Sequence, residues 1–228
     1  MEQKLPVIVQ KYISEVAQKY SKKPILLKSK NSSTLMKAIG WFFKITKIGP
    51  AFMEEYFTTI GNTIYYPDDL ITTMSETAIL EVVVHECLHI KDNNKFGVLY
   101  PVLYLGPQIF AVVSILSLVA IFASKLWLLW LFAILFLAPI PSFGRYYLEK
   151  RAYRTSFVFG KYLYNYEEVG FADLRNWING QLSTKAYYFA LPFPKWVDND
   201  LKNTEFLDTV EYQEIANFIK TNLLGKRV

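Results

Sequence analysis

His85-Glu86-Cys87-Leu88-His89 contains the only two histidines of this 228-residue chain, with a glutamate directly after the first. In an α-helix, side chains at positions i and i+4 lie on the same face, so the two imidazoles can bind one metal ion. HExxH is the spacing of a zinc-binding helix. A water molecule on zinc has a pKa of ~7, and Glu86 is the candidate base that accepts its proton. The alternative is that two ordinary histidines flank a glutamate by chance.

The surrounding residues predict that this stretch lies on a helix. Apolar residues recur at helical spacing along one side, and the two histidines lie on another stripe. Thr73 and Glu76 have the spacing of a capping box at the start of the helix. A polar run followed by Gly97 is suited to ending it.

Residues 58–67, just upstream, have strand composition, with Gly61-Asn62 as a bend or hairpin turn. The unpaired backbone groups of a strand at a sheet edge can bind an extended peptide, whatever its side chains. We interpret this segment as such an edge strand. The alternative is an ordinary internal strand.

Two histidines do not complete a catalytic zinc site, which normally has three protein ligands and a water molecule. Because the chain has no other histidine, the third ligand should be a carboxylate or a thiolate. Cys87 is the only cysteine, and its position between the histidines turns it away from their face. The best carboxylate lies far downstream, at Glu149.

The two motifs together resemble the gluzincins, zinc metallopeptidases in which HExxH is followed by a helix that carries ExxA. Glu149-Lys150-Arg151-Ala152-Tyr153 is similar to the ExxAY form of the compact minigluzincins. The resemblance covers about residues 55 to 160 and is specific only at the two short motifs. The small side chain of Ala152 suits a close approach of the two helices. The alternative role for Glu149 is a solvated charge beside two basic neighbours.

The resemblance implies a fold and a ligand set. The expected fold class is α+β, a zincin-like core with a small sheet and two metal-binding helices. His85, His89 and Glu149 would bind Zn²⁺, and Glu86 would be the general base. In zincins an edge strand that pairs with substrate precedes the HExxH helix.

One departure from the family pattern concerns the residues around the ligands. Several gluzincins continue ExxxD, with an aspartate that orients a histidine, but this chain has Tyr153 at that position. An acceptor for each imidazole N–H is still expected, and Asp92 or Glu81 can serve. Tyr153 is the candidate for stabilising the oxyanion of the tetrahedral intermediate, with Tyr146 and Arg154 as alternatives.

Residues 98–143, between the motifs, are almost entirely apolar, and Lys125 is the one charged residue among them. Two apolar segments joined by Ser124-Lys125 approach the ~20 residues that span a bilayer as a helix, although Gly106-Pro107 interrupts the first. We therefore predict a transmembrane helical hairpin. The alternatives are a hairpin buried within an oligomer and a re-entrant loop.

A hairpin would return the chain to the side that it left, where the two motif helices can meet. Basic residues flank this open end, against Lys125 alone at the tip, so the positive-inside rule predicts an integral membrane protein with its active site facing the cytoplasm. The order of motifs is similar to that of integral-membrane gluzincins such as the bacterial heat-shock protease and the CAAX prenyl protease.

Length and composition suit one catalytic unit. We expect residues 1–97 to form its N-terminal part with the HExxH helix, 98–143 the hairpin, and 144–228 the glutamate-ligand helix and a C-terminal helical part. The net charge of +5 arises from 25 basic and 20 acidic residues. With no nucleic-acid motif, this excess indicates anionic lipid rather than nucleic acid as a partner. A single cysteine excludes an internal disulfide.

The sequence therefore predicts a membrane-associated zinc metalloendopeptidase that acts on a protein or peptide substrate. Lipid would be contacted through residues 98–143, and the oligomeric state is open. The alternative from a different class is a catalytically silent, zinc-stabilised component of a larger assembly, structural or membrane-active, such as a viral one.

Overall fold

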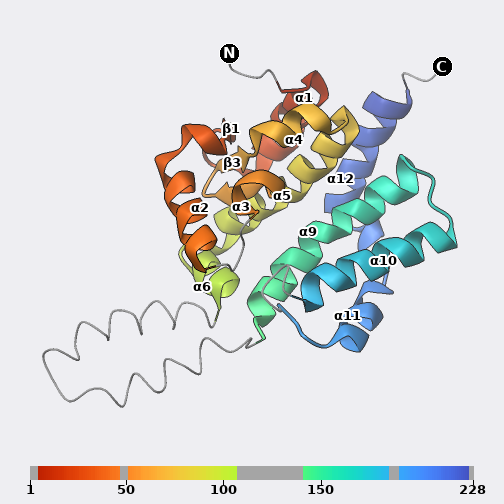
Figure 1. The fold of residues 1–228 in the computed structure, drawn as a ribbon. Helices are drawn as coiled ribbons and strands as arrows, with labels where there is room; N and C mark the ends of the chain where they lie inside the picture. The colour runs from red at the N-terminus through yellow and green to blue at the C-terminus, as the bar shows by residue number, and fades with distance from the viewer. Residues whose placement is uncertain (1–4, 47–50, 107–140, 185–189, 226–228) are drawn as a thin grey trace, which may run out of the picture.

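Two long helices, α5 (Glu76–Phe96) and α9 (Phe143–Tyr162), pack against each other in the middle of the molecule (Figure 1). They are seen in a computed structural model that describes residues 5–46, 51–106, 141–184 and 190–225. Although the two helices are distant in sequence, the packing brings the HExxH and ExxA motifs together.

The ends of α5 follow from local chemistry. The hydroxyl of Ser75 accepts a hydrogen bond from the backbone N–H of Ala78 at 3.2 Å, so the N-cap is Ser75 and not Thr73. Thr73 instead ends the preceding helix, α4 (Asp68–Thr73). At the other end the chain leaves the helix at Gly97, which adopts a φ of +54°, an angle that glycine adopts without strain. The predicted helix is thus confirmed, with its start moved by two residues.

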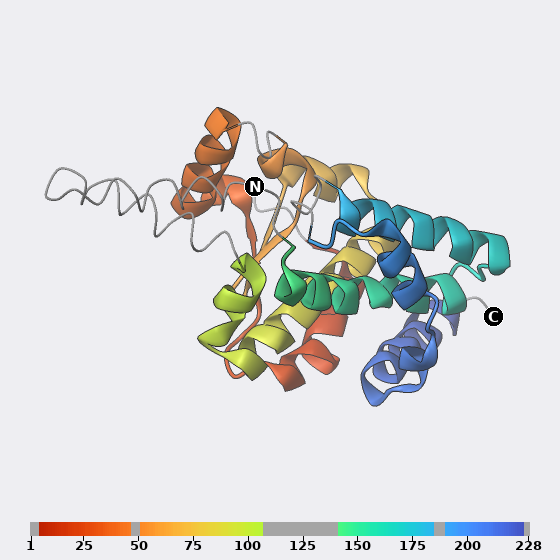
Figure 2. The same ribbon diagram turned by 90° about the horizontal axis from the view of Figure 1, so that it is seen from below.

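Shorter helices surround the central pair (Figures 1 and 2). On one side, α1 packs against α5; on the other, α10 and α12 pack against α9, and α11 packs against α10. The remaining bounds are α1 (Val7–Glu15), η1 (Ala17–Tyr20), η2 (Lys30–Ser32), α2 (Thr34–Thr46), α3 (Phe52–Glu55), α6 (Leu99–Leu105), α10 (Glu168–Ser183), α11 (Pro194–Leu201), η4 (Glu205–Asp208), α12 (Val210–Ile219) and η5 (Lys220–Leu224).

A small sheet lies beside α5, with the order β1-β3-β2. Its middle strand, β3 (Thr63–Tyr66), pairs in parallel with β1 (Leu26–Ser29) and antiparallel with β2 (Thr58–Ile60). Gly61, at φ +60°, opens the turn between β2 and β3, as the Gly61-Asn62 pair predicted. Of the segment predicted as an edge strand, β2 is therefore at an edge of the described sheet and contacts α5, whereas β3 is the internal strand.

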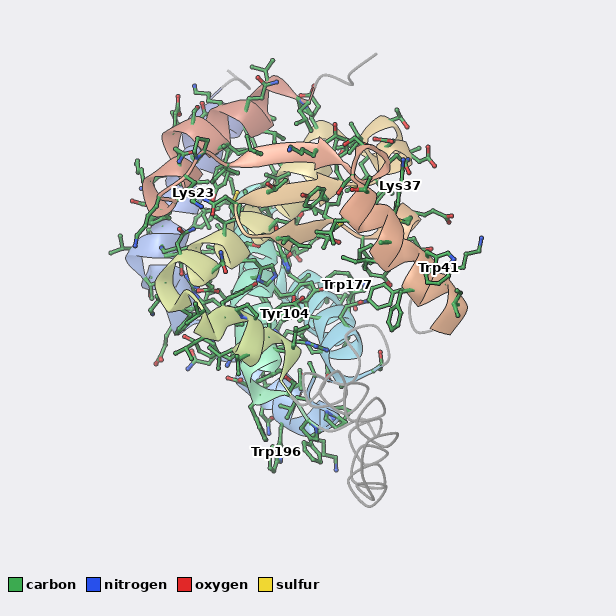
Figure 3. All side chains as sticks on the ribbon, turned by 90° about the vertical axis from the view of Figure 1, so that its left-hand side faces the viewer. Lys23, Lys37, Trp41, Tyr104, Trp177 and Trp196 are labelled. Carbon is green, nitrogen blue, oxygen red and sulfur yellow. The ribbon has the colours of Figure 1, made fainter. Side chains whose placement is uncertain are left out.

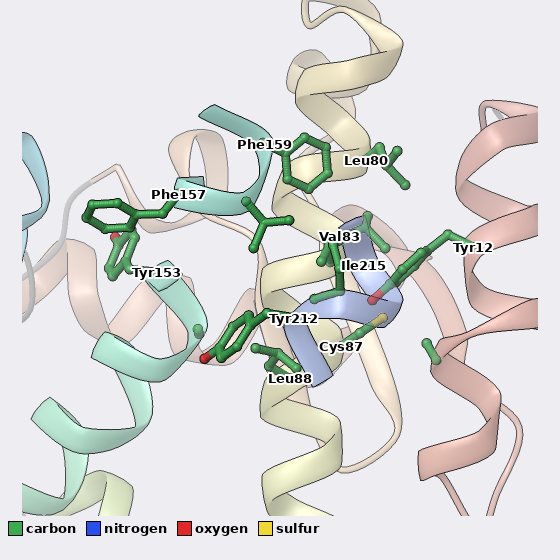
Figure 4. Packing of buried hydrophobic residues seen from close by; sticks show 14 of the residues in the cluster. Tyr12, Leu80, Val83, Cys87, Leu88, Tyr153, Phe157, Phe159, Tyr212 and Ile215 are labelled. Atoms are coloured by element: carbon green, nitrogen blue, oxygen red, sulfur yellow. The ribbon is translucent and has the colours of Figure 1, made fainter. Parts of the chain in front are cut away.

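The hydrophobic core is centred on α5 (Figure 4). Val83 is fully buried on this helix, beside Ile215 from α12. Cys87 points to the same side of α5, toward Tyr12 of α1, and Tyr153 lies on the opposite side (Figure 4). One side of α5 thus packs against α1 and lies beside Ile215 of α12, which leaves another side for the polar residues of the motif.

The α+β fold class expected from the sequence is wrong, because the described chain is mostly helical and its three strands have only three or four residues each. Over residues 35–48, aromatic residues and lysines leave strand and helix equally open from the sequence; the described part, to residue 46, belongs to helix α2. Its outer side exposes Trp41 and Lys37 (Figure 3). The sheet is an addition to a helical body rather than a layer of its own.

The transmembrane hairpin over residues 98–143 also requires correction, together with the integral membrane location inferred from it. Among the described residues, no helix combines the length and the apolar composition that crossing a bilayer requires. The first expected span begins instead as α6, a helix of seven residues that ends at Gly106 with φ +47°. Residues 107–140, on which most of the predicted hairpin falls, lie outside the described residues.

Candidate metal centre

Three predicted ligands meet where α5 and α9 pack together. The Oε2 atom of Glu149, from α9, lies 3.5 Å from Nε2 of His85 and 3.5 Å from Nε2 of His89, both from α5. All three donor atoms lie within 4.8 Å of one another. The sequence motifs 60 residues apart are thus brought to a single point by helix packing, and Ala152, which is fully buried on α9, leaves room for it.

These distances fit a shared cation better than hydrogen bonds. At 3.5 Å a nitrogen–oxygen pair is longer than an ordinary hydrogen bond, and Oε2 of Glu149 is a buried atom without a hydrogen-bond partner in the described chain. Ligand atoms at about 2.0–2.1 Å from one tetrahedral ion lie about 3.4 Å apart. Two imidazole nitrogens and one carboxylate oxygen are also a donor set of catalytic zinc sites. The residues therefore fit a divalent metal ion.

The pKa shifts of Glu149 and His89 both reflect their close approach to each other. Burial raises the pKa of Glu149, but the neighbouring imidazoles of His89 and His85 outweigh it, and the pKa lies well below its ordinary range. Burial lowers the pKa of His89, but the carboxylate of Glu149 outweighs it, and the pKa is raised. His89 therefore holds a proton more readily beside the fully buried carboxylate than a free imidazole would.

The second oxygen of Glu149 has a separate partner. Oε1 accepts a hydrogen bond from the hydroxyl of Tyr104, from α6, a residue labelled in Figure 3. The ring of Tyr104 also contacts the imidazole of His89 edge-on, with the centroids 5.8 Å apart. Burial raises the pKa of Tyr104, so its hydroxyl keeps the proton that it donates. The two oxygens of Glu149 are therefore distinguished by their surroundings.

The candidate base Glu86 is held from the sheet. Oε2 of Glu86 accepts a 2.7 Å hydrogen bond from the hydroxyl of Thr59, in the middle of β2. Thr59 pairs with Ile64 of β3, whose side chain is fully buried, and this pairing fixes the position of the threonine. The edge strand and the base are thus joined by one side-chain contact.

An ionic network lies behind His89. Asp92, which is fully buried on α5, accepts through Oδ1 from Nη1 of Arg151, from α9. Arg151 also pairs with Glu211 of α12, which accepts from Lys91 at 2.7 Å. Nδ1 of His89 and Oδ2 of Asp92 are both buried without a hydrogen-bond partner in the described chain. The network joins α5, α9 and α12 next to the candidate metal ligands.

Among the expected oxyanion residues, Tyr153 contacts a candidate ligand: its ring lies against His85 with the centroids 4.7 Å apart. The two alternatives have other partners, because Tyr146 donates to Asp200 at 2.6 Å and the guanidinium of Arg154 lies over the ring of Phe206. The role of Tyr153 stays a prediction.

The other candidates near the motif are accounted for by their contacts. The carboxylate of Glu81 accepts from the hydroxyl of Tyr164 at 3.0 Å. Cys87 is buried in the core, and burial raises the pKa of its thiol. As expected from its place between the histidines, Cys87 is not in the metal-binding group of the described chain.

Sequence reasoning missed Thr59 and Tyr104. Thr59 lies in the strand that the sequence predicts, and its polar side chain opposite a buried isoleucine is the signal that it serves more than packing. Tyr104 lies in the segment that hydropathy assigns to a membrane span, where an aromatic residue is common and does not indicate a functional site.

Comparisons of the chain with protein-family models, with curated proteins and with solved structures find no match.

Proposed function

We propose that this chain is a zinc-dependent metallopeptidase of the gluzincin type. His85, His89 and Glu149 would bind the metal ion, and Glu86 would be the general base. The observation that carries the proposal is the buried, unpartnered Oε2 atom of Glu149, 3.5 Å from Nε2 of both imidazoles. A buried carboxylate facing two imidazoles is costly unless a cation neutralises it.

The chemistry divides between the ion and the chain. Zinc, when bound, lowers the pKa of water and polarises a peptide carbonyl. Glu86 accepts the proton of the attacking water and returns it to the leaving amine. The hydrogen bond from Thr59 occupies Oε2 of Glu86 and leaves Oε1 for this proton transfer. We expect the substrate to pair with β2, whose edge offers backbone groups to an extended peptide.

The experiment combines metal analysis with a quenched-peptide assay on the purified chain. The wild type should contain one zinc per chain and cleave peptides. Glu86→Gln should keep its zinc and lose hydrolysis, whereas His85→Ala should lose both. Full zinc occupancy in His85→Ala would reject the ligand assignment, and equal hydrolysis by wild type and Glu86→Gln would reject the base.

The second candidate function is a metal site that only holds helices together. It is favoured by burial, because Glu149 is fully buried and His89 only 4% exposed. In this case zinc would have four fixed ligands and no position for water. The same assay distinguishes the two functions: a zinc-loaded wild type that cleaves no peptide would support the structural role.

A further inference from the structure

The carboxylate of Glu149 has two oxygens with different partners. Oε1 accepts from the hydroxyl of Tyr104, whereas Oε2 alone faces Nε2 of His85 and His89. A carboxylate that is free to rotate can bind a metal ion through either oxygen or through both. Here one oxygen is already occupied.

Tyr104 is itself held by the helix that carries Glu149. Nε of Arg145, one turn before Glu149 on α9, donates to the backbone carbonyl of Tyr104 at 2.8 Å. The guanidinium of Arg145 also lies 5.3 Å from the centre of the Tyr104 ring. The carbonyl and the ring of Tyr104 are thus fixed by the same helix whose carboxylate its hydroxyl contacts.

Close backbone contact brings α6 to this position. A Cβ atom at Gly144, near the start of α9, would lie well inside van der Waals distance of the carbonyl of Leu103. Only glycine therefore allows α6 to approach α9 so closely. This backbone contact fixes α6 against α9 and thereby places Tyr104 beside Glu149.

We propose that Tyr104 is a positioning residue for the metal centre, which sets Glu149 to bind the ion through Oε2 alone. This inference rests on the metal site of the proposed function, but not on peptide hydrolysis. By keeping Oε1 occupied, Tyr104 leaves the coordination position beside Oε2 open for water. Partners that orient ligands in this way typically contribute a factor of roughly 10–100 to metal affinity.

The test compares zinc affinity, measured by competition with a chromophoric chelator, in the wild type, Tyr104→Phe and Tyr100→Phe. Phenylalanine keeps the ring against His89 and removes only the hydroxyl. Tyr100 is the control for proximity alone: its ring stacks on Tyr104 at 5.8 Å, and burial and the nearby Glu149 raise the pKa of its hydroxyl, but that hydroxyl has no hydrogen bond to the described residues. Circular dichroism of the metal-free proteins checks that all three are folded.

Tyr104→Phe should bind zinc roughly 10–100-fold more weakly than the wild type, and Tyr100→Phe within roughly threefold of it. With Co²⁺ in place of zinc, Tyr104→Phe should absorb less in the visible, because a carboxylate bound through both oxygens raises the coordination number. Equal affinity and equal spectra in wild type and Tyr104→Phe would overturn this inference and leave the metal site standing. A folded wild type that binds no zinc would overturn the proposed function as well.

Discussion

The hydroxyl of Thr59 donates a 2.7 Å hydrogen bond to Oε2 of Glu86, and so joins the edge strand β2 to the helix that carries both histidines. The carboxylate of a general base must be both anchored and accessible. Thr59 provides the anchor through one oxygen. Since β2 is also the strand on which we expect substrate to pair, the proposed function would link the position of Glu86 to the position of the peptide.

Thr59→Val should therefore reduce kcat with little change in zinc content. A hydrogen bond to a charged group contributes about 1.5–3 kcal/mol, which corresponds to a roughly 10–100-fold loss of rate. Steady-state kinetics on a quenched peptide measure the effect. Thr58→Val is the control, because it makes the same change one residue earlier on the same strand, and it should retain most activity. Similar losses in both variants would show that the strand, and not the hydroxyl, is responsible.

The stability of the metal-free protein should depend on pH through His89 and Glu149. Because the pKa of His89 is raised in the folded state, its protonation stabilises the fold. This stabilisation is fully present at pH values below 6.5, the ordinary pKa of histidine, and is lost as pH rises through the folded-state pKa. Because the pKa of Glu149 is lowered in the folded state, its ionised carboxylate also stabilises the fold. This stabilisation is fully present at pH values above 4.5, the ordinary pKa of glutamate, and is lost as pH falls through the folded-state pKa. Both contributions are complete between pH 4.5 and 6.5.

Urea unfolding of the chelator-treated protein across pH measures this dependence. Glu149→Gln removes the carboxylate from the pair, so its stability should vary less over the same range. An unchanged pH profile in Glu149→Gln would show that the His89–Glu149 pair does not control it.

Arg151→Met should destabilise the fold strongly. The substitution leaves the fully buried carboxylate of Asp92 without its cation, a change that typically costs about 3–5 kcal/mol. Lys150→Met, at the neighbouring position of α9, breaks a pair with the partly exposed Asp200, whose carboxylate keeps its hydrogen bond from Tyr146, and should cost less than Arg151→Met. The free energy of unfolding in urea gives both values. Equal values for the two variants would mean that the buried Arg151–Asp92 pair contributes no more than the partly exposed Lys150–Asp200 pair.

Cys87 should be chemically silent in the native protein. Its thiol is buried, and burial raises its pKa, so little thiolate is available to react. Iodoacetamide should label Cys87 only after unfolding, as mass spectrometry can show, and Cys87→Ala should retain its zinc. Rapid labelling of the native chain, or loss of zinc in Cys87→Ala, would contradict this placement.

Local sequence patterns predicted the elements that carry the site. The spacing of His85 and His89 indicated one helical face, Gly97 indicated the end of that helix, and Gly61-Asn62 indicated the turn before it. Each of these signals depends on a few neighbouring residues, so each can be read without the fold. The pairing of Glu149 with both histidines depended on the resemblance, because nothing local relates residues 60 positions apart.

The features that sequence missed depend on packing between distant segments. Hydropathy counts apolar residues over 98–143, but it does not show that α6 ends at Gly106. It also does not show that Gly144, which lacks a Cβ atom, lets the backbone of α6 lie close to α9. Tyr104 acquires its role only from this contact. The fold class was wrong for a similar reason, since strand-like composition does not reveal how short the strands of a helical protein are.

A zinc K-edge X-ray absorption spectrum of the loaded protein is the decisive measurement for the metal centre. Two imidazole nitrogens at about 2.0–2.1 Å and oxygen ligands at about 2.0–2.2 Å should fit the spectrum, with no sulfur. In His85→Ala and in Glu149→Gln this signature should be lost. A sulfur ligand, or an unchanged spectrum in both variants, would place the metal elsewhere and contradict a centre formed by His85, His89 and Glu149.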